Sequence, residues 1–345
     1  MTTTLVTPTP EATSGGAASA GLTRRDEIAF MVFSTWMIAG LFLDGWSHNV
    51  RKPETFFTPW HALLYSGFQM AVLWAMWDGR RAKRRGEAPM GVDRLANVGI
   101  ALFAVGAIGD FLWHTLLGIE VNVEGLLSPT HLTLMTGGIL LASTPIRTAL
   151  AAARGRGAAR PVATIAVVQS AIATTAIVAF FTQFAGAFRG WEMRDAVALR
   201  GMGHVAEMNA IIGVVSIIVT NAVLVSAVSF LVTRFTLRRG ALTALLGIVA
   251  LAVSGLTSFD HVIVVLSAIA AGALADIAVA RGRADLAPVI VPVVMWPLWT
   301  ALLASTTTWG WSPNVWGGAI FFSVLSGVAL RTLTGAALQA RPSGA

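Results

Sequence analysis

The amino-acid sequence predicts an all-α fold, a polytopic bundle of transmembrane helices. Of the 345 residues, 55% are hydrophobic and only 12% are charged, and the mean hydropathy is +0.72. An ordinary soluble domain carries about 25% charged residues, so this chain has too little polar surface for a water-soluble globule. A membrane protein is the class that remains, and a nucleic-acid partner is excluded despite the net charge of +7. The absence of Cys excludes a disulfide framework and a cysteine metal site.

The chain divides into a short polar tail and a long apolar part. Residues 1–23 are rich in Thr, Ala, Gly, Ser and Pro, which predicts a disordered cytoplasmic tail without a cleavable signal. About ten apolar stretches follow, most of them long enough to cross a hydrocarbon core about 30 Å thick. In chain order, these are residues 27–48, 59–78, 95–117, 129–150, 162–187, 203–233, 240–259, 261–280, 287–305 and 314–335. The seventh and eighth stretches run together around Asp260.

Basic residues set the expected orientation of these spans. Arginine and lysine gather in alternate loops, within residues 80–85, 147–160, 234–239 and 281–283. Since basic loops stay in the cytoplasm, we expect a multi-pass protein of the cell membrane with both termini cytoplasmic. The spans would then form five helical hairpins with their tips outside. Residues 24–150 would hold the first four spans, and residues 151–345 the remaining six.

All six histidines lie near the expected outer tips. They open or close predicted spans, and none falls in a cytoplasmic loop or in the tail. Ionisable side chains at membrane depth are costly, so their gathering on one side indicates a functional site. In chain order, the histidines are His48, His61, His114, His131, His204 and His261.

The first two hairpins repeat one pattern of polar residues. Each ends its first span with Asp-x-x-x-His and opens its second with Ser or Thr, Pro, any residue and His. Residues four apart share a face of a helix, so the Asp and the first His can reach one ion. The hydroxyl residue is a helix N-cap and Pro takes the first helical position. The second His falls at the third position, where the helix dipole favours the neutral imidazole that binds metal. The two sets are Asp44, His48 and His61, and Asp110, His114 and His131.

Two histidines and one carboxylate are a recurring ligand set for copper, zinc and non-haem iron. The repeat therefore predicts one metal site in each hairpin, or two halves of a dinuclear centre. Nearby aromatic residues would either line a pocket or form an interfacial belt: these are Trp46, Trp60, Tyr65 and Trp113. Secondary ligand candidates are Glu54, Glu120, Glu124, His204, Glu207, Asp260 and His261.

The first motif resembles the C subunit of the copper-dependent membrane monooxygenases, which comprise the particulate methane and ammonia monooxygenases. That subunit carries Asp-x3-His-x12-His with a Phe-Thr-Pro-x-His string at the second His, and Asp44, His48 and His61 have this spacing. Its second copper site uses an Asn-x3-His pair followed by Pro-x-His, and the segment from Asp110 to His131 is similar. The likeness covers roughly residues 40–138.

The resemblance implies copper at both sets, oxidation of an apolar substrate that arrives from the bilayer, and other membrane subunits as partners. Metal binding carries over better than oxygenase activity, because the sequence departs from the family in several places. Asp110 stands where the family has Asn, and the gap from His114 to His131 is longer. That gap holds two extra glutamates, and the chain has at least four spans beyond the usual subunit. Ligand types alone leave iron and zinc open.

Two other functions fit the same residues. A membrane transporter or metal-handling protein also uses repeated hairpins and polar helix ends. It needs ionisable groups through the depth of the membrane, and Asp276 is the clearest acid near the inner ends of the later spans. A zinc-dependent intramembrane hydrolase needs three ligands, an open position and a general base, a part that Glu54, Glu120 or Glu124 would play.

Overall fold

The computed structural model describes residues 23–50, 56–85, 94–118, 122–158, 160–189, 203–306 and 309–339, and these ranges contain helices but no named strand. The all-α prediction is therefore confirmed. The long helices are α1 (Arg24–Val50), α2 (Pro59–Arg85), α3 (Arg94–Leu116), α5 (Pro129–Ala142), α6 (Thr144–Gly155), α7 (Ile165–Phe181), α9 (His204–Arg234), α10 (Ala241–Gly255), α11 (Val265–Ala280), α12 (Ala287–Thr306) and α13 (Pro313–Gln339). Short elements are α4 (Asn122–Leu127), η1 (Gln183–Ala185), η2 (Val262–Val264) and η3 (Ala284–Leu286).

Six helical segments are long and apolar enough to cross a membrane, which supports an integral membrane protein. They are α1, α3, α9, η2 with α11, η3 with α12, and α13. The bent pair α5 and α6 would make a seventh. Each of the ten predicted stretches contains a helix, but α7 and α10 have only 17 and 15 residues. The count of ten spans, their hairpin arrangement and their orientation stay predictions.

The fourth predicted span is broken where the sequence suggested a continuous helix. The axes of α5 and α6 differ by 42°, and the break lies at Ser143. Pro145 is the second residue of α6, and a proline has no backbone N–H to continue the helical hydrogen bonds of α5. The bend therefore follows from a residue that the apolar pattern alone passes over.

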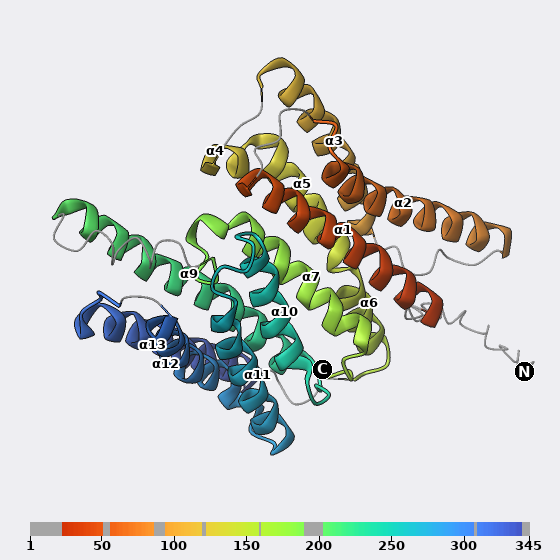
Figure 1. Cartoon of the computed structure of the whole chain (residues 1–345). Helices are drawn as coiled ribbons and strands as arrows, with labels where there is room; N and C mark the ends of the chain where they lie inside the picture. Colours follow the sequence, from red (N-terminus) through yellow and green to blue (C-terminus); the bar gives the residue numbers. More distant parts are fainter. Residues whose placement is uncertain are drawn as a thin grey trace, which may run out of the picture.

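The helices form two groups joined by α7 (Figure 1). Helices α1, α2, α3 and α5 make one group, whereas α9, α12 and α13 lie on the opposite side of the molecule. Helix α7 contacts α1 and α5 in the first group and α9 and α10 in the second. The first group contains both repeated Asp-His-His motifs, so the fold separates them from most of the later helices.

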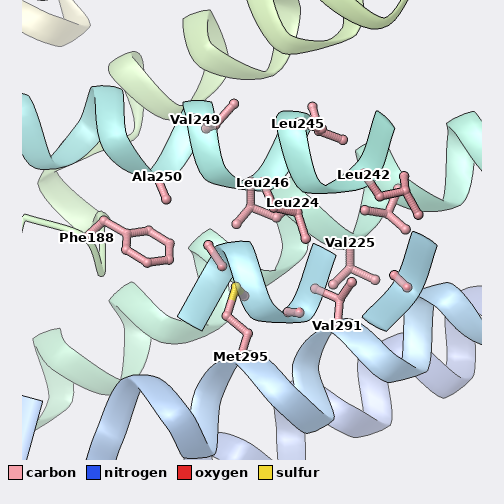
Figure 2. Close-up of a cluster of buried hydrophobic side chains, with 14 of the residues drawn as sticks. Phe188, Leu224, Val225, Leu242, Leu245, Leu246, Val249, Ala250, Val291 and Met295 are labelled. Carbon is pink, nitrogen blue, oxygen red and sulfur yellow. The ribbon is translucent and has the colours of Figure 1, made fainter. Parts of the chain in front are cut away.

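The later helices pack around a continuous buried core (Figure 2). Leu246 of α10, Leu224 of α9 and Met295 of α12 meet there, and each is fully or almost fully buried. Van der Waals packing stabilises such contacts, since lipid tails are as apolar as the side chains. Asn221 adds polar contacts in this group: it accepts from Trp296 Nε1 at 2.9 Å and donates to Ser326 Oγ at 2.7 Å.

Glycines bring the helices of each repeat into backbone contact. A Cβ on Gly40 of α1 would lie 2.5 Å from backbone atoms of Leu64 in α2. At the equivalent place in the second repeat, a Cβ on Gly106 of α3 would lie 2.9 Å from the backbone N of Leu134 in α5. Each glycine precedes the motif aspartate by four residues. The repeat therefore includes the helix crossing that brings the second His beside the Asp-x-x-x-His face.

Candidate metal centre

The first motif gathers at the end of α1 and the start of α2. Asp44 and His48 are one turn apart on α1, and Asp44 Oδ2 lies 3.8 Å from His48 Nε2. His61, the third residue of α2, places its Nε2 3.4 Å from the same carboxylate oxygen. The three side chains therefore lie close enough together to hold a metal ion.

The start of α2 fixes the orientation of His61. The Thr58 hydroxyl accepts the His61 backbone N–H at 3.1 Å, which is the predicted N-cap. His61 Nδ1 lies 2.6 Å from the Phe56 carbonyl oxygen, which can only accept, so Nδ1 carries the proton. The other ring nitrogen, Nε2, then faces Asp44. A hydrogen bond of this kind commonly sets the tautomer of a metal-binding histidine.

The second motif has the same arrangement at the end of α3 and the start of α5. Asp110 Oδ1 lies 3.3 Å from His114 Nε2 and 3.2 Å from His131 Nε2. Ser128 caps α5 by accepting the His131 backbone N–H at 3.3 Å, and its Oγ also lies 2.7 Å from His131 Nδ1. A hydroxyl, which can donate or accept, therefore takes the place in the second site that the backbone carbonyl has in the first.

Both motifs have the spacing of metal ligands. Within each motif, one potential ligand atom per residue lies within 4.8 Å of the others. Ligand atoms on a tetrahedral ion with bonds of about 2.1 Å lie about 3.4 Å apart. The four carboxylate–imidazole distances, from 3.2 to 3.8 Å, are close to that value. These are the two three-ligand groups among the described residues.

The two motifs open onto one cavity of about 500 Å³, lined by all six side chains. The rings of His61 and His114 are neighbours, with centroids 6.3 Å apart. These inner side chains are 6% and 3% exposed, whereas His48 and His131 at the outer ends are 28% and 24% exposed. The two motifs therefore lie side by side in the wall of one cavity.

The rest of the cavity wall is mainly apolar. Its lining includes Met37 and Leu41 of α1, Phe103 of α3, Leu134 of α5 and Ile177 of α7. The cavity thus joins two polar ligand sets to a space that suits a hydrocarbon group.

Tyr65 is the one predicted aromatic residue that lines this cavity. Trp46 instead packs edge-to-face on Trp60, with ring centroids 5.7 Å apart, and donates to Ser258 Oγ at 2.9 Å. The Tyr65 hydroxyl donates to Asp110 Oδ2 at 2.9 Å, a contact that the sequence analysis missed. The sequence feature that could have indicated this role of Tyr65 is its four-residue spacing from His61, which puts both side chains on one face of α2.

The secondary candidates do not complete a further three-ligand group among the described residues. His204 and Glu207 lie 4.0 Å apart, but their side chains are 83% and 72% exposed. His261 and Asp260 lie 3.8 Å apart. Glu124 is exposed on α4 and belongs to neither motif. Glu54 and Glu120 lie outside the described residues.

No protein-family model, curated protein or solved structure matches this chain. The structure shows a membrane-type helical protein with two groups of Asp and His that could each hold a metal ion.

Proposed function

We propose that this chain is an integral membrane copper protein that oxidises an apolar small molecule, as its resemblance to the C subunit of copper membrane monooxygenases implies. The observation that carries the proposal is the convergence of two Asp-His-His groups on one cavity. Each group supplies two imidazole nitrogens and one carboxylate oxygen, a set that suits copper. Such three-residue sets leave coordination positions for a small molecule.

Copper bound there would supply one-electron redox chemistry toward dioxygen. The protein's part is to hold the ligands and to control access. The Phe56 carbonyl accepts from His61 Nδ1 and leaves Nε2 facing Asp44, and the Ser128 hydroxyl holds the ring of His131 through a hydrogen bond at Nδ1. Preorientation of this kind raises metal affinity, because the site loses less side-chain freedom when the ion binds.

The cavity supports an apolar substrate. Its volume of about 500 Å³ is that of a site for a small organic molecule. Side chains such as Leu41, Phe103 and Ile177 would hold a hydrocarbon group and exclude water beside the ligand sets. An apolar substrate would partition into the bilayer and enter the cavity from there.

Metal analysis of the purified full-length protein tests the first part of the proposal. The protein would be loaded with copper, zinc and iron in competition, dialysed, and analysed by mass spectrometry. We expect two copper ions per chain, and one in each of the variants His48→Ala and His114→Ala. Retention of zinc or iron in preference would contradict copper, and the absence of bound metal would contradict both sites.

Oxidation is tested with copper-loaded protein in lipid nanodiscs, with ascorbate as reductant. We expect dioxygen uptake that depends on a short alkane and yields the corresponding alcohol. Copper binding without substrate-dependent dioxygen uptake would leave a metal-binding protein and reject the oxidase function.

A metal-handling protein is the second candidate, favoured by polar contacts between α1 and α7. Gln169 of α7 accepts from Ser34 at 3.2 Å and donates to Thr35 Oγ1 at 3.0 Å. These contacts lie one turn from Met37, which lines the cavity, toward the N-terminal end of α1. They would extend a polar route from the ligand sets. If this route carries copper, proteoliposomes that contain the protein should take up copper. The variant Gln169→Leu should abolish this uptake, and the control Ser66→Ala should leave it intact.

Asp276 gives no support to a transport route. Its carboxylate accepts the backbone N–H groups of Leu242 at 3.2 Å and of Thr243 at 3.0 Å, and the Thr243 hydroxyl at 2.7 Å. It therefore satisfies the first N–H groups of α10, which have no partner within that helix. The burial of this acid is explained by helix capping.

A further inference from the structure

The two sites differ in how the second oxygen of the carboxylate is held. Asp110 presents Oδ1 to His114 and His131, while its Oδ2 accepts from Tyr65 at 2.9 Å. Asp44 presents Oδ2 to its two histidines, and its Oδ1 is buried without a hydrogen-bond donor among the described residues. One carboxylate is thus anchored at its far oxygen, and the other is not.

Tyr65 reaches Asp110 from the other repeat. It lies on α2, one turn after His61, and its hydroxyl crosses to α3. Its ring packs against Phe56 and Phe103, with centroid distances of 5.8 and 6.4 Å. These contacts hold the ring in place, so the hydroxyl has a defined position. The equivalent residue of the second repeat, four after His131, is Met135, which has no hydroxyl to offer Asp44.

We propose that Tyr65 is a positioning residue of the second site, which holds Asp110 Oδ2 so that Oδ1 alone is presented to the metal. This inference rests on the proposed metal binding. A carboxylate anchored in this way binds through one oxygen, whereas Asp44 keeps both oxygens for its ion. Partners that orient metal ligands typically contribute about 10–100-fold to metal affinity. The two sites are therefore unequal in affinity and in carboxylate coordination.

The test separates the sites before it alters the tyrosine. Full-length protein with Asp44→Ala and His48→Ala retains the second site, and protein with Asp110→Ala and His114→Ala retains the first. Tyr65→Phe is added to each, because it removes the hydroxyl and keeps the ring. Ser66→Ala is the matched control: it also removes one hydroxyl from α2, where Ser66 donates to the helix carbonyl of Leu63 at 3.0 Å.

Copper(II) affinity is measured against a competing chelator, and the site geometry by electron paramagnetic resonance. In the protein with the second site alone, Tyr65→Phe should weaken copper binding about 10–100-fold and change the hyperfine coupling. In the protein with the first site alone, affinity and spectrum should be unchanged, as they should be with Ser66→Ala in both.

Three results overturn the inference. An unchanged affinity and spectrum at the second site would show that the hydroxyl does not position Asp110. An equal loss at both sites would show a general effect on packing. Absence of copper from the second site when Tyr65 is present would reject the metal function of that site together with the inference, whereas the first two results leave metal binding intact.

Discussion

The two candidate sites share one sequence motif but differ in the groups that orient their histidines. In the first site, the carbonyl of Phe56 accepts from His61 Nδ1 at 2.6 Å. In the second, the side chain of Ser128 lies 2.7 Å from His131 Nδ1. A carbonyl is part of the backbone and remains after any substitution, whereas a hydroxyl can be removed. The hydrogen bond that orients His131 can therefore be removed by substituting one residue that is not a ligand, whereas the bond that orients His61 cannot.

The two carboxylates also differ in the hydrogen bonds that support them. Asp110 Oδ2 accepts from Tyr65 of the other repeat, while Asp44 has no donor to Oδ1 among the described residues. The two repeats thus share the Asp-His-His group and the helix crossing. The supporting hydrogen bonds depend on which neighbour each repeat has in the fold.

Removal of the carboxylates should have the largest effect and should separate the sites. We expect Asp44→Ala and Asp110→Ala each to lose one copper ion per chain. Asp110→Ala should also lower stability further, because the partly buried Tyr65 hydroxyl loses its acceptor, at a cost of about 0.5–1.5 kcal/mol. Copper content and thermal unfolding in detergent check both effects. Equal stability of the two variants would argue against the asymmetry, and loss of both ions from either variant would argue against separate sites.

Glycine substitutions test whether each helix pair is a unit. A Cβ at Gly67 would lie 2.8 Å from the backbone N of Met37, and one at Gly137 would lie 2.6 Å from that of Phe103. Overpacking typically costs about 1–3 kcal/mol, so both alanine variants should unfold at lower temperature. We expect each to weaken copper binding mainly at the site of its own repeat. A matched loss at both sites would show that the repeats do not act separately.

Removal of the helix caps should give the smallest difference in copper affinity between the two sites. Thr58→Ala and Ser128→Ala each remove an N-cap, which costs about 1 kcal/mol of stability. Only Ser128→Ala also removes the group beside His131 Nδ1, so it alone should weaken copper binding at its site, by about 10-fold. Chelator competition measures the difference, and Ser128→Thr should restore affinity. An equal effect of both alanine variants on copper would remove the distinction between the two supports.

Local periodicity was enough to predict most of the candidate site. The four-residue spacing of Asp44 and His48 places them on one helix face whatever the tertiary fold. The N-cap at Thr58 follows from the residues next to it, and both features are present in the structure. Their repetition around Asp110 and His131 made the second group predictable by the same argument.

The parts that depend on tertiary contacts were not predictable in this way. Tyr65 and Asp110 are 45 residues apart, and only the packing of α2 beside α3 brings them together. The break at Ser143 depends on a proline within an apolar stretch, which hydropathy does not register. The merging of both ligand sets into one cavity likewise depends on how the two repeats pack against α7.

Anomalous diffraction from crystals of the copper-loaded protein, at the copper absorption edge, tests the central claim most directly. The claim is that one cavity holds two ions, each bound by its own Asp-His-His set. We expect two anomalous peaks, one among Asp44, His48 and His61 and one among Asp110, His114 and His131, with the first lost in Asp44→Ala. A single peak shared by both sets, or the absence of a peak at either set, would contradict it.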